Sequence, residues 1–263
     1  MSTELLELAL RTAIDAASFV KTERGEGRVV IADTKSSPTD VVTELDRRCE
    51  ALIRATLLAA RPDDGFLGEE EAEHLGASDT RWIVDPIDGT VNFVYGLPSS
   101  AVSIAAERDG VVVAGCVVNI STGVTYGAVR GEGSFVVRDG IRKPLTAPEP
   151  TSLAQMLVGT GFSYERDIRL RQAQAMVKLI TEIRDIRRIG SAALDLCAVA
   201  DGSLDAYVEQ GLKPWDLAAG GLIAEEAGVV IAGLDGPAEE RLTMACHPAL
   251  AGEYFALIKA CGF

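Results

Sequence analysis

The sequence has few of the residues that most often perform acid-base catalysis: among its 263 residues only two are histidines, His74 and His247. A histidine-rich zinc site or a Ser-His-Asp triad therefore has little support, because each histidine would have to lie near a suitable partner by chance. The cysteines likewise give no sign of a metal site or of a disulfide framework. The five cysteines form no C-x-x-C pair, and their odd number fits reduced intracellular thiols better than a disulfide framework.

Motifs for nucleotide cofactors and signals for membranes are absent as well. Neither a Walker loop nor a strand-linked G-x-G-x-x-G occurs, which argues against a kinase or a dehydrogenase. The formal net charge of -14, from 25 basic and 39 acidic residues, disfavours direct binding to nucleic acid or to an anionic membrane. No stretch approaches the roughly 20 apolar residues that span a bilayer, and the acidic N-terminus shows no secretory signal. We therefore expect a soluble, cytoplasmic protein.

What the sequence does contain is a pair of carboxylates three residues apart, just past an apolar strand, in the run Trp82–Phe93. The apolar residues before Asp85 are typical of a buried strand, and Pro86 lacks an N–H donor, so we expect strand pairing to end there. Asp85 and Asp88 then lie at the mouth of a strand. Gly89 permits an unusual backbone conformation, and a helix that begins after it would favour an anion. Hard oxygen ligands beside an anion site suit magnesium and a phosphate ester.

Ordinary structural roles compete with this interpretation. An isolated Asp-x-x-Asp is most often a solvated turn, and Glu69 stands in an acidic run that by itself would suggest an exposed face. The segment Thr43–Asp46 precedes an apolar helical pattern, where it would form a capping box. Asp216 would serve as the N-cap of a helix over 217–227. Partner motifs elsewhere in the chain are needed to decide between these roles and a metal site.

The hexapeptide Asp85–Thr90 (Asp-Pro-Ile-Asp-Gly-Thr) resembles the signature of the inositol monophosphatase family, a group of magnesium-dependent, lithium-sensitive phosphomonoesterases. One hexapeptide could arise by chance. Further elements that resemble the family appear in the expected order along almost the whole chain: Lys35–Asp40, Thr43–Asp46, Gly68–Glu70, Gly190–Ala193 and Trp215–Gly220. Their conjunction makes the resemblance specific.

The resemblance implies two to three Mg²⁺ ions in the active site. It assigns the first metal to Glu69, Asp85 and the backbone carbonyl of Ile87. The second metal is assigned to Asp85, Asp88 and Asp216, with Asp85 as the bridge. A weaker third ion would share Glu69. Two cations about 3.5 to 4 Å apart can activate a water, neutralise phosphoryl charge and stabilise the leaving alkoxide.

Three residues are implied as catalytic. The resemblance gives Asp46 a hydrogen bond to Thr90, and this pair would orient the attacking water together with Glu69. With no histidine available as a base, a metal-bound water of lowered pKa is the most economical nucleophile. For Asp46 the capping role stays open as an alternative, and one side chain can serve both.

The residues that the resemblance places around the substrate are Asp88, Gly89, Thr90, Gly190, Ser191, Ala192, Glu209 and Asp216. The amides of Gly89 and Thr90 would contact the phosphate, and two carboxylates facing several hydroxyls suit a polyol. Glu209 could instead be a surface carboxylate at a strand end. Lys35 resembles a family lysine on a loop that reaches toward the site, and its alternative is an ordinary solvated lysine.

The hydrophobic pattern predicts an amphipathic helix over 6–20 and an antiparallel meander over 100–138. A second helix would place on one face Leu45, Cys49, Leu52, Ile53 and Thr56. After three prolines between 144 and 150, strands alternate with helices, as in an α/β half. We therefore expect an α+β half at residues 1–146 with the metal-binding motifs, and an α/β half at 147–263 that completes the metal and substrate site. The resemblance implies that the halves stack as an αβαβα layered sandwich with the active site between them.

The function that the resemblance implies is magnesium-dependent hydrolysis of myo-inositol 1-phosphate to myo-inositol and phosphate. Fructose-1,6-bisphosphatase, histidinol-phosphate phosphatase and 3'-phosphoadenosine 5'-phosphate phosphatase use the same metal core and remain alternatives. A non-enzymatic alternative is a regulatory protein that binds the transcription machinery. The resemblance also implies a homodimer, although no pattern in the sequence demonstrates one.

Overall fold

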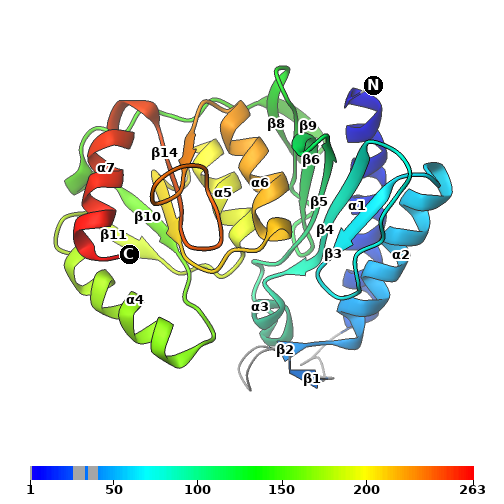
Figure 1. Cartoon of the computed structure of the whole chain (residues 1–263), viewed down its shortest axis with the longest axis horizontal. Coiled ribbons are helices and arrows are strands. Elements are labelled where there is room, and N and C mark those ends of the chain that lie inside the picture. The colour runs from blue at the N-terminus through cyan, green and yellow to red at the C-terminus, as the bar shows by residue number, and fades with distance from the viewer. Residues whose placement is uncertain (1, 26–32, 35–40) are drawn as a thin grey trace.

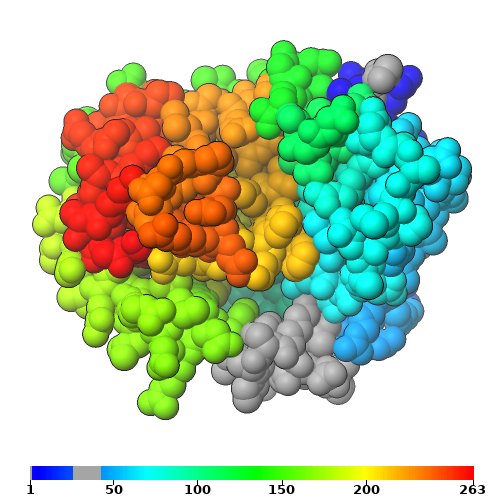
Figure 2. Space-filling view, viewed as in Figure 1, coloured from blue at the N-terminus to red at the C-terminus, as the bar shows by residue number. Residues whose placement is uncertain are grey.

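The computed structural model describes residues 2–25, 33–34 and 41–263. Lys35 and the rest of the motif at 35–40 lie outside the described residues. Within the described part, two β-sheets and the helices beside them form alternating layers (Figure 1). In the space-filling view, the segments up to about residue 100 (blue to cyan) and the segments beyond about residue 150 (yellow-green to red) occupy opposite sides of the molecule (Figure 2).

The helices are α1 (Ser2–Arg24), α2 (Glu44–Ala60), α3 (Thr90–Tyr95), α4 (Arg166–Leu179), α5 (Ala192–Asp201), α6 (Pro214–Glu226) and α7 (Pro248–Cys261), with a 3-10 turn at Leu153–Gln155.

The seven-stranded sheet has the order β3 (Gly65–Gly68), β4 (Thr80–Asp88), β5 (Ala101–Arg108), β6 (Val111–Asn119), β7 (Thr125–Val129), β8 (Gly133–Arg138) and β9 (Ile141–Pro144). The five-stranded sheet has the order β11 (Asp185–Arg187), β10 (Leu157–Thr160), β12 (Ala206–Glu209), β14 (Thr243–Cys246) and β13 (Val230–Ala232). A separate antiparallel pair consists of β1 (Asp33–Thr34) and β2 (Val41–Val42).

Three apolar clusters hold the layers together. The first lies between α1, α2 and one face of the seven-stranded sheet, where Phe66 and Trp82 are fully buried. The second fills the space between the other face of that sheet, helices α5 and α6, and the five-stranded sheet. The third packs α4 and α7 on the outer face of the five-stranded sheet. The order is helix, sheet, helix, sheet, helix, which confirms the predicted layered arrangement (Figure 1).

Two of the predicted elements in the first half are confirmed. The helix expected over 6–20 is the central part of α1, and most of its apolar residues are buried, whereas Ile14 is exposed. The meander expected over 100–138 is formed by β5 to β8, which pair with one another in antiparallel order. No helix in the described ranges combines the length and the apolar character that crossing a bilayer requires.

The buried face of α2 differs from the predicted one. Cys49 and Ile53 are fully buried, as expected, but Leu52 and Thr56 are exposed. Leu57 takes the next core position instead, four residues after Ile53 on the same side of the helix.

The strand that carries the two aspartates does not end at Pro86, and that prediction was wrong. β4 continues to Asp88, which pairs with Ala101 of β5, and the register shifts between Asp85 and Asp88. An irregularity of this kind accommodates the missing N–H of Pro86, so that pairing resumes beyond it. Both aspartates are therefore held within a sheet.

The second half is a mixed unit and not a purely parallel one. β10 pairs in parallel with β11 and β12, whereas β14 runs antiparallel to β12 and β13. The boundary expected between residues 146 and 147 falls in the connection from β9 to the second sheet. The division into halves stays a prediction, since α5 and α6 pack against both sheets.

Helix α6 approaches the seven-stranded sheet closely at Gly115 of β6. A Cβ added at Gly115 would lie 3.0 Å from the Cα atom and 3.2 Å from the Cβ atom of Ala219. This approach bears on the site because α6 carries Asp216 in its first turn.

We expect the substitution Gly115→Val to lower the free energy of unfolding by about 1 to 3 kcal/mol, because the added methyl groups have no room against Ala219. Urea unfolding measures the change. Gly252→Ala in α7 is the control, since no described atom lies within 4 Å of the position of its Cβ, and it should gain up to about 1 kcal/mol of helix propensity. A Gly115→Val protein as stable as the wild type would contradict the close packing.

Candidate active site

A cavity of about 640 Å³ lies between the end of β4, the starts of α5 and α6, and the end of β12. The predicted metal and substrate residues of the described part all line it: Glu69, Asp85, Ile87, Asp88, Gly89, Thr90, Gly190, Ser191, Ala192, Glu209 and Asp216. Residues from both sheets, more than a hundred positions apart in the sequence, are thus brought to one cavity.

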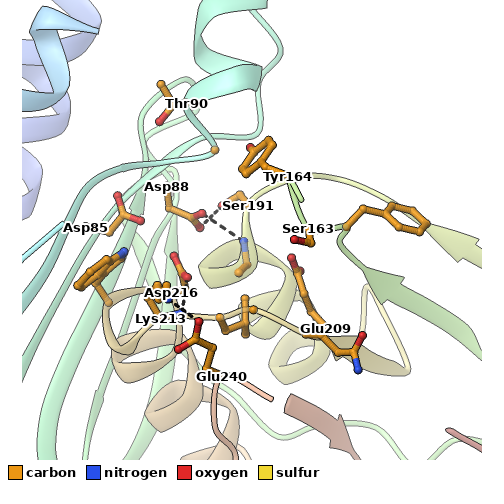
Figure 3. A pocket seen from close by; sticks show the side chains of 18 of the residues that line it. Asp85, Asp88, Thr90, Ser163, Tyr164, Ser191, Glu209, Lys213, Asp216 and Glu240 are labelled. Atoms are coloured by element: carbon orange, nitrogen blue, oxygen red, sulfur yellow. Dashed lines mark hydrogen bonds and ion pairs between the residues drawn. The ribbon is translucent and has the colours of Figure 1, made fainter. Parts of the chain in front are cut away.

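Three aspartates converge on one side of this cavity (Figure 3). Asp85, Asp88 and Asp216 each have a carboxylate oxygen within 4.8 Å of the others. Asp85 and Asp88 come from β4, whereas Asp216 comes from the first turn of α6. Oxygen ligands this close together suit hard divalent cations, which gather several carboxylates.

The carboxylate of Asp88 lies on the N-terminus of α5. Its Oδ2 atom accepts hydrogen bonds from Ser191 Oγ at 2.5 Å and from the Ala193 amide at 2.8 Å, and its Oδ1 atom accepts one from the Ala192 amide at 3.3 Å. Ser191 is the N-cap of α5, so an aspartate from the first sheet satisfies helix amides that would otherwise lack partners. Asp88 therefore joins β4 to the start of α5 through one side chain.

Several carboxylates lie close together in this part of the molecule, and the pKa values of Asp88 and Asp216 are raised. Burial raises the pKa of Asp88, and hydrogen bonds from Ser191, Ala193 and Ala192 offset part of that effect. Burial raises the pKa of Asp216 well above its ordinary value, and the charges of Asp88 and Glu69 add to the increase. Buried carboxylates without a compensating cation resist ionisation, so the cluster favours the binding of positive charge.

Asp216 does not cap its helix in the predicted way. α6 begins at Pro214 and not at Leu217, and Lys213 occupies the N-cap position. Asp216 lies at the third helical position, from which its Oδ2 atom accepts a hydrogen bond from the Lys213 amide at 2.7 Å. Its position is thus fixed at the helix start, while it remains beside Asp88 at the cavity.

Asp46 makes both of the interactions that were considered for it. Its Oδ2 atom accepts a hydrogen bond from the Thr43 amide at 2.8 Å and another from the Thr43 hydroxyl, which forms the capping box of α2. Its Oδ1 atom accepts a hydrogen bond from Thr90 Oγ1 at 3.0 Å. The same hydroxyl lies 3.1 Å from the Ile87 carbonyl oxygen, and its single proton can be donated to only one of the two.

The turn between β4 and α3 is fixed by contacts with Ser99 and with the segment 189–190. Gly89 has a left-handed backbone, with φ at 88°, and a Cβ there would lie 2.8 Å from the Ser99 carbonyl oxygen and 2.9 Å from that of Gly190. Asn92 Nδ2 donates hydrogen bonds to the Ser99 and Ile189 carbonyl oxygens at 2.8 and 2.7 Å. The amides of Gly89 and Thr90 thus belong to a turn with little freedom to move.

Glu69 is carried by a segment that Glu50 of α2 holds in place. Glu50 is fully buried, and its carboxylate accepts hydrogen bonds from the Glu70 amide at 2.9 Å and the Glu71 amide at 2.8 Å. A side chain at Gly68 would overlap the same carboxylate. Burial raises the pKa of Glu50, and the two amides offset part of the increase.

Glu209 lies on the other side of the cavity from the three aspartates (Figure 3). It is half-buried and therefore differs from the exposed strand-end carboxylate of the alternative interpretation. The hydroxyl of Tyr207 donates a hydrogen bond to its Oε2 atom. Burial raises the pKa of Glu209 to about 7, although the Tyr207 hydrogen bond and the charge of Arg188 act in the opposite direction.

Three contributors to the site were not identified from the sequence: Glu50, Asn92 and Tyr207. Glu50 is adjacent to Cys49 and offers no periodic signal, because a glutamate on a helix is most often solvated. Asn92 stands inside the run Trp82–Phe93, but two of its hydrogen-bond partners are the carbonyls of Ile189 and Gly190, which are 97 and 98 positions away in the sequence. Tyr207 alternates with Glu209 along β12, which the strand pattern could have indicated.

The donor set is chemically uniform. Among the described residues that line the cavity, the groups able to bind a metal are carboxylate, carbonyl and hydroxyl oxygens, with no histidine or cysteine. Such a set fits Mg²⁺ and disfavours zinc or copper.

Comparison with known proteins addresses the whole chain. The model of the inositol monophosphatase family matches residues 1–260. Inositol-1-monophosphatase SuhB of Mycobacterium tuberculosis is 44% identical over 237 residues, which are 85% of this chain and 82% of that protein. Nus factor SuhB of Pasteurella multocida is 38% identical over 234 residues, 88% of this chain and 86% of that protein. The solved structure of Mycobacterium tuberculosis SuhB has a TM-score of 0.86 at 40% identity and covers 100% of this chain and 98% of its own.

Replacing Glu50 by Gln should lower the free energy of unfolding by about 1 to 3 kcal/mol, because an NH₂ group then faces one of the two amides and leaves it unpaired. Urea unfolding measures the loss. Glu71→Gln is the matched control: Glu71 pairs with Arg54 at the surface, so its loss should cost at most about 1 kcal/mol. Equal stabilities of the two variants would contradict the role assigned to Glu50.

The increase in melting temperature that Mg²⁺ produces should be larger at about pH 7.5 than at about pH 5.5. In the metal-free protein, the folded pKa values of Asp88, Asp216 and Glu209 are raised above their ordinary values, for Glu209 from 4.5 to about 7. Between those values the folded chain holds more protons than the unfolded chain, so the free energy of unfolding falls as pH rises. Magnesium competes with these protons.

Thermal unfolding in Mg²⁺ and in a chelator, at both pH values, measures the two increments. Potassium chloride at the same ionic strength controls for general screening, since a monovalent cation screens charge without gathering several carboxylates. An increment that does not change with pH would mean that the buried carboxylates do not bind the cation.

Proposed function

The chain belongs to the inositol monophosphatase family, and on that premise we propose that it hydrolyses myo-inositol 1-phosphate to myo-inositol and inorganic phosphate with bound Mg²⁺. Family membership makes the chain a phosphatase; the ester and the metal are the proposal. The observation that supports it most directly is the convergence of Asp85, Asp88 and Asp216 within 4.8 Å in a cavity lined by oxygen donors.

Two to three Mg²⁺ ions would be held by residues that line the cavity. Glu69, Asp85 and the carbonyl of Ile87 would bind the first ion. Asp85, Asp88 and Asp216 would bind the second, and a weaker third ion would share Glu69. When bound, such cations lower the pKa of a coordinated water and neutralise phosphoryl charge.

The protein's own part in the reaction is to orient water and phosphate. With its proton donated to Asp46 and not to the Ile87 carbonyl, Thr90 Oγ1 would use its lone pairs to accept a hydrogen bond from a water. Glu69 would accept a second hydrogen bond from that water. The amides of Gly89 and Thr90 would donate to the phosphate oxygens, in a turn that Asn92 holds in shape.

The alcohol part of the ester would lie toward Glu209 and the start of α5. Glu209 and Asp216 can accept hydrogen bonds from hydroxyl groups, and Gly190, Ser191 and Ala192 line the wall between them. A cavity of about 640 Å³ has room for a phosphorylated six-carbon ring. A small phosphorylated polyol is therefore the substrate class that we propose.

Other esters remain possible within the same chemistry. The metal ligands and the amides act on the phosphate, whereas only a few side chains contact the alcohol. Fructose 1,6-bisphosphate, histidinol phosphate and 3'-phosphoadenosine 5'-phosphate are the alternatives to test.

A regulatory role in transcription is the second candidate, because relatives that cover most of this chain are named Nus factor SuhB. If the chain has such a role independently of catalysis, an Asp88→Asn variant that no longer releases phosphate should still retain its partner in a pull-down. Homodimer formation, inhibition by lithium and a cytoplasmic location also belong to the proposal, and each is open to direct measurement.

We expect Asp88→Asn to reduce phosphate release from myo-inositol 1-phosphate by at least about 100-fold, because one proposed metal ligand and the acceptor for α5 are altered together. The assay compares the wild type with and without Mg²⁺ and includes the three alternative esters. Faster turnover of another ester would change the substrate and keep the metal chemistry.

Asp109→Asn is the matched control. Asp109 is an exposed turn residue with φ at 49°, a conformation that asparagine tolerates well, so its activity should equal that of the wild type. Absence of magnesium-dependent release from all four esters by the wild type would refute the proposed function.

A further inference from the structure

Gly159 of β10 and Gly161, which directly follows the end of that strand, lie beside two large side chains of β12. The strands pair in parallel, and the register places Gly159 opposite Tyr207 and Thr160 opposite Val208, so Gly161 follows next to Glu209. Side chains two positions apart along a strand point to the same face, so Tyr207 and Glu209 share one. On that face β10 carries no side chain at either position.

The absence of side chains at these glycines leaves room for the tyrosine and the glutamate. A Cβ at Gly159 would lie 3.1 Å from the ring of Tyr207 and 2.7 Å from Leu204. A Cβ at Gly161 would overlap all three carboxyl atoms of Glu209. The backbone of β10 therefore forms a flat support against which both side chains lie.

Tyr207 stands behind Glu209 and does not itself line the cavity. Its side chain is fully buried, and its hydroxyl donates a hydrogen bond to Glu209 Oε2. The other charges around Glu209 include Asp88, Asp195 and Asp216, which repel it, and Arg188, which attracts it. Without the Tyr207 hydroxyl, these charges alone would decide where the carboxylate lies.

We propose that Tyr207 and Gly161 are positioning residues that fix the Glu209 carboxylate for hydrogen bonding to the hydroxyls of the substrate's alcohol, and so determine the preference for hydroxyl-rich esters. The inference rests on the proposed function, since Glu209 is the residue assigned there to the alcohol. With Oε2 bound to Tyr207, Oε1 and the remaining lone pairs are directed by a rigid support. A preorganised acceptor of this kind discriminates more sharply than a mobile one.

The test compares two esters with each variant. Myo-inositol 1-phosphate carries five hydroxyls on its alcohol, whereas p-nitrophenyl phosphate carries none on its leaving group. Tyr207→Phe should lower kcat/KM for the inositol ester by about tenfold, mainly through KM, because a charge-assisted hydrogen bond that orients the acceptor is lost. Its kcat/KM for p-nitrophenyl phosphate should stay within about twofold of the wild type, since the phosphate and metal residues are unchanged.

Gly161→Ala is the second variant and acts on the same carboxylate from the other side. Its added methyl group overlaps the present position of Glu209, so the same selective loss on the inositol ester is expected. It keeps the inference testable if Tyr207→Phe does not fold. Tyr254→Phe is the matched control, because Tyr254 is a fully buried tyrosine whose hydroxyl has no hydrogen-bond partner among the described residues.

Equal losses on both esters in Tyr207→Phe and Gly161→Ala would overturn the inference and leave the pair a purely structural role. Unchanged kinetics on the inositol ester in both variants would overturn it as well. A wild type that hydrolyses p-nitrophenyl phosphate but no hydroxyl-rich ester would refute the proposed substrate class, an outcome distinct from the failure of Tyr207 and Gly161 to act through Glu209.

Discussion

The hydrogen bonds between the Asp88 carboxylate and the N-terminus of α5 are the interaction on which the rest of the site depends. Asp88 reaches this position because β4 continues past Pro86 and returns to pairing with β5. Ser191 and the two amides that follow it then bind the carboxylate. Asp216, on the adjacent helix, is thereby brought within reach of the two aspartates of β4. Asp88, a proposed metal ligand, thus also connects the seven-stranded sheet to helix α5. The packing of these two layers and the geometry of the site therefore depend on each other.

Four carboxylates in or behind the cavity share a mode of support. Hydroxyls and backbone amides bind Asp88, Asp216, Glu50 and Glu209, whereas surface carboxylates of the same chain pair with arginines. Neutral donors fix the direction of a carboxylate without cancelling its charge. The negative charge of these carboxylates is therefore available to bind cations. Without cations, burial raises the pKa values of Asp88 and Asp216. Hydroxyls and amides therefore orient the carboxylates, and the carboxylates themselves supply the charge.

The sequence predicted what depends on short, contiguous signals. Short signals of this kind indicated the aspartates of the run Trp82–Phe93, the capping box at Thr43 and Asp46, and the meander after residue 100. It failed where a neighbour distant in the chain decides the outcome. Pro86 does not end its strand because β5 resumes pairing beyond it, and α6 begins before Asp216 because Pro214 can occupy a first helical turn. Glu50 belongs to the same class, because its burial follows from packing and a glutamate on a helix gives no local sign of it.

The placement of Asp88 has a consequence for how the protein discriminates between anions. The first amides of α5 are the natural receptor for a phosphate in a cavity of this kind, but an aspartate already occupies them, and Asp216 likewise binds the amide of Lys213 at the start of α6. The start of α3 is the helix start that the proposed mechanism leaves to the phosphate, and its six residues carry a weak dipole. Ionised carboxylates at this position would disfavour the binding of sulfate, phosphate or a nucleotide until divalent cations offset their charge. Cellular magnesium, and not substrate concentration alone, would then decide when the cavity is open to anions.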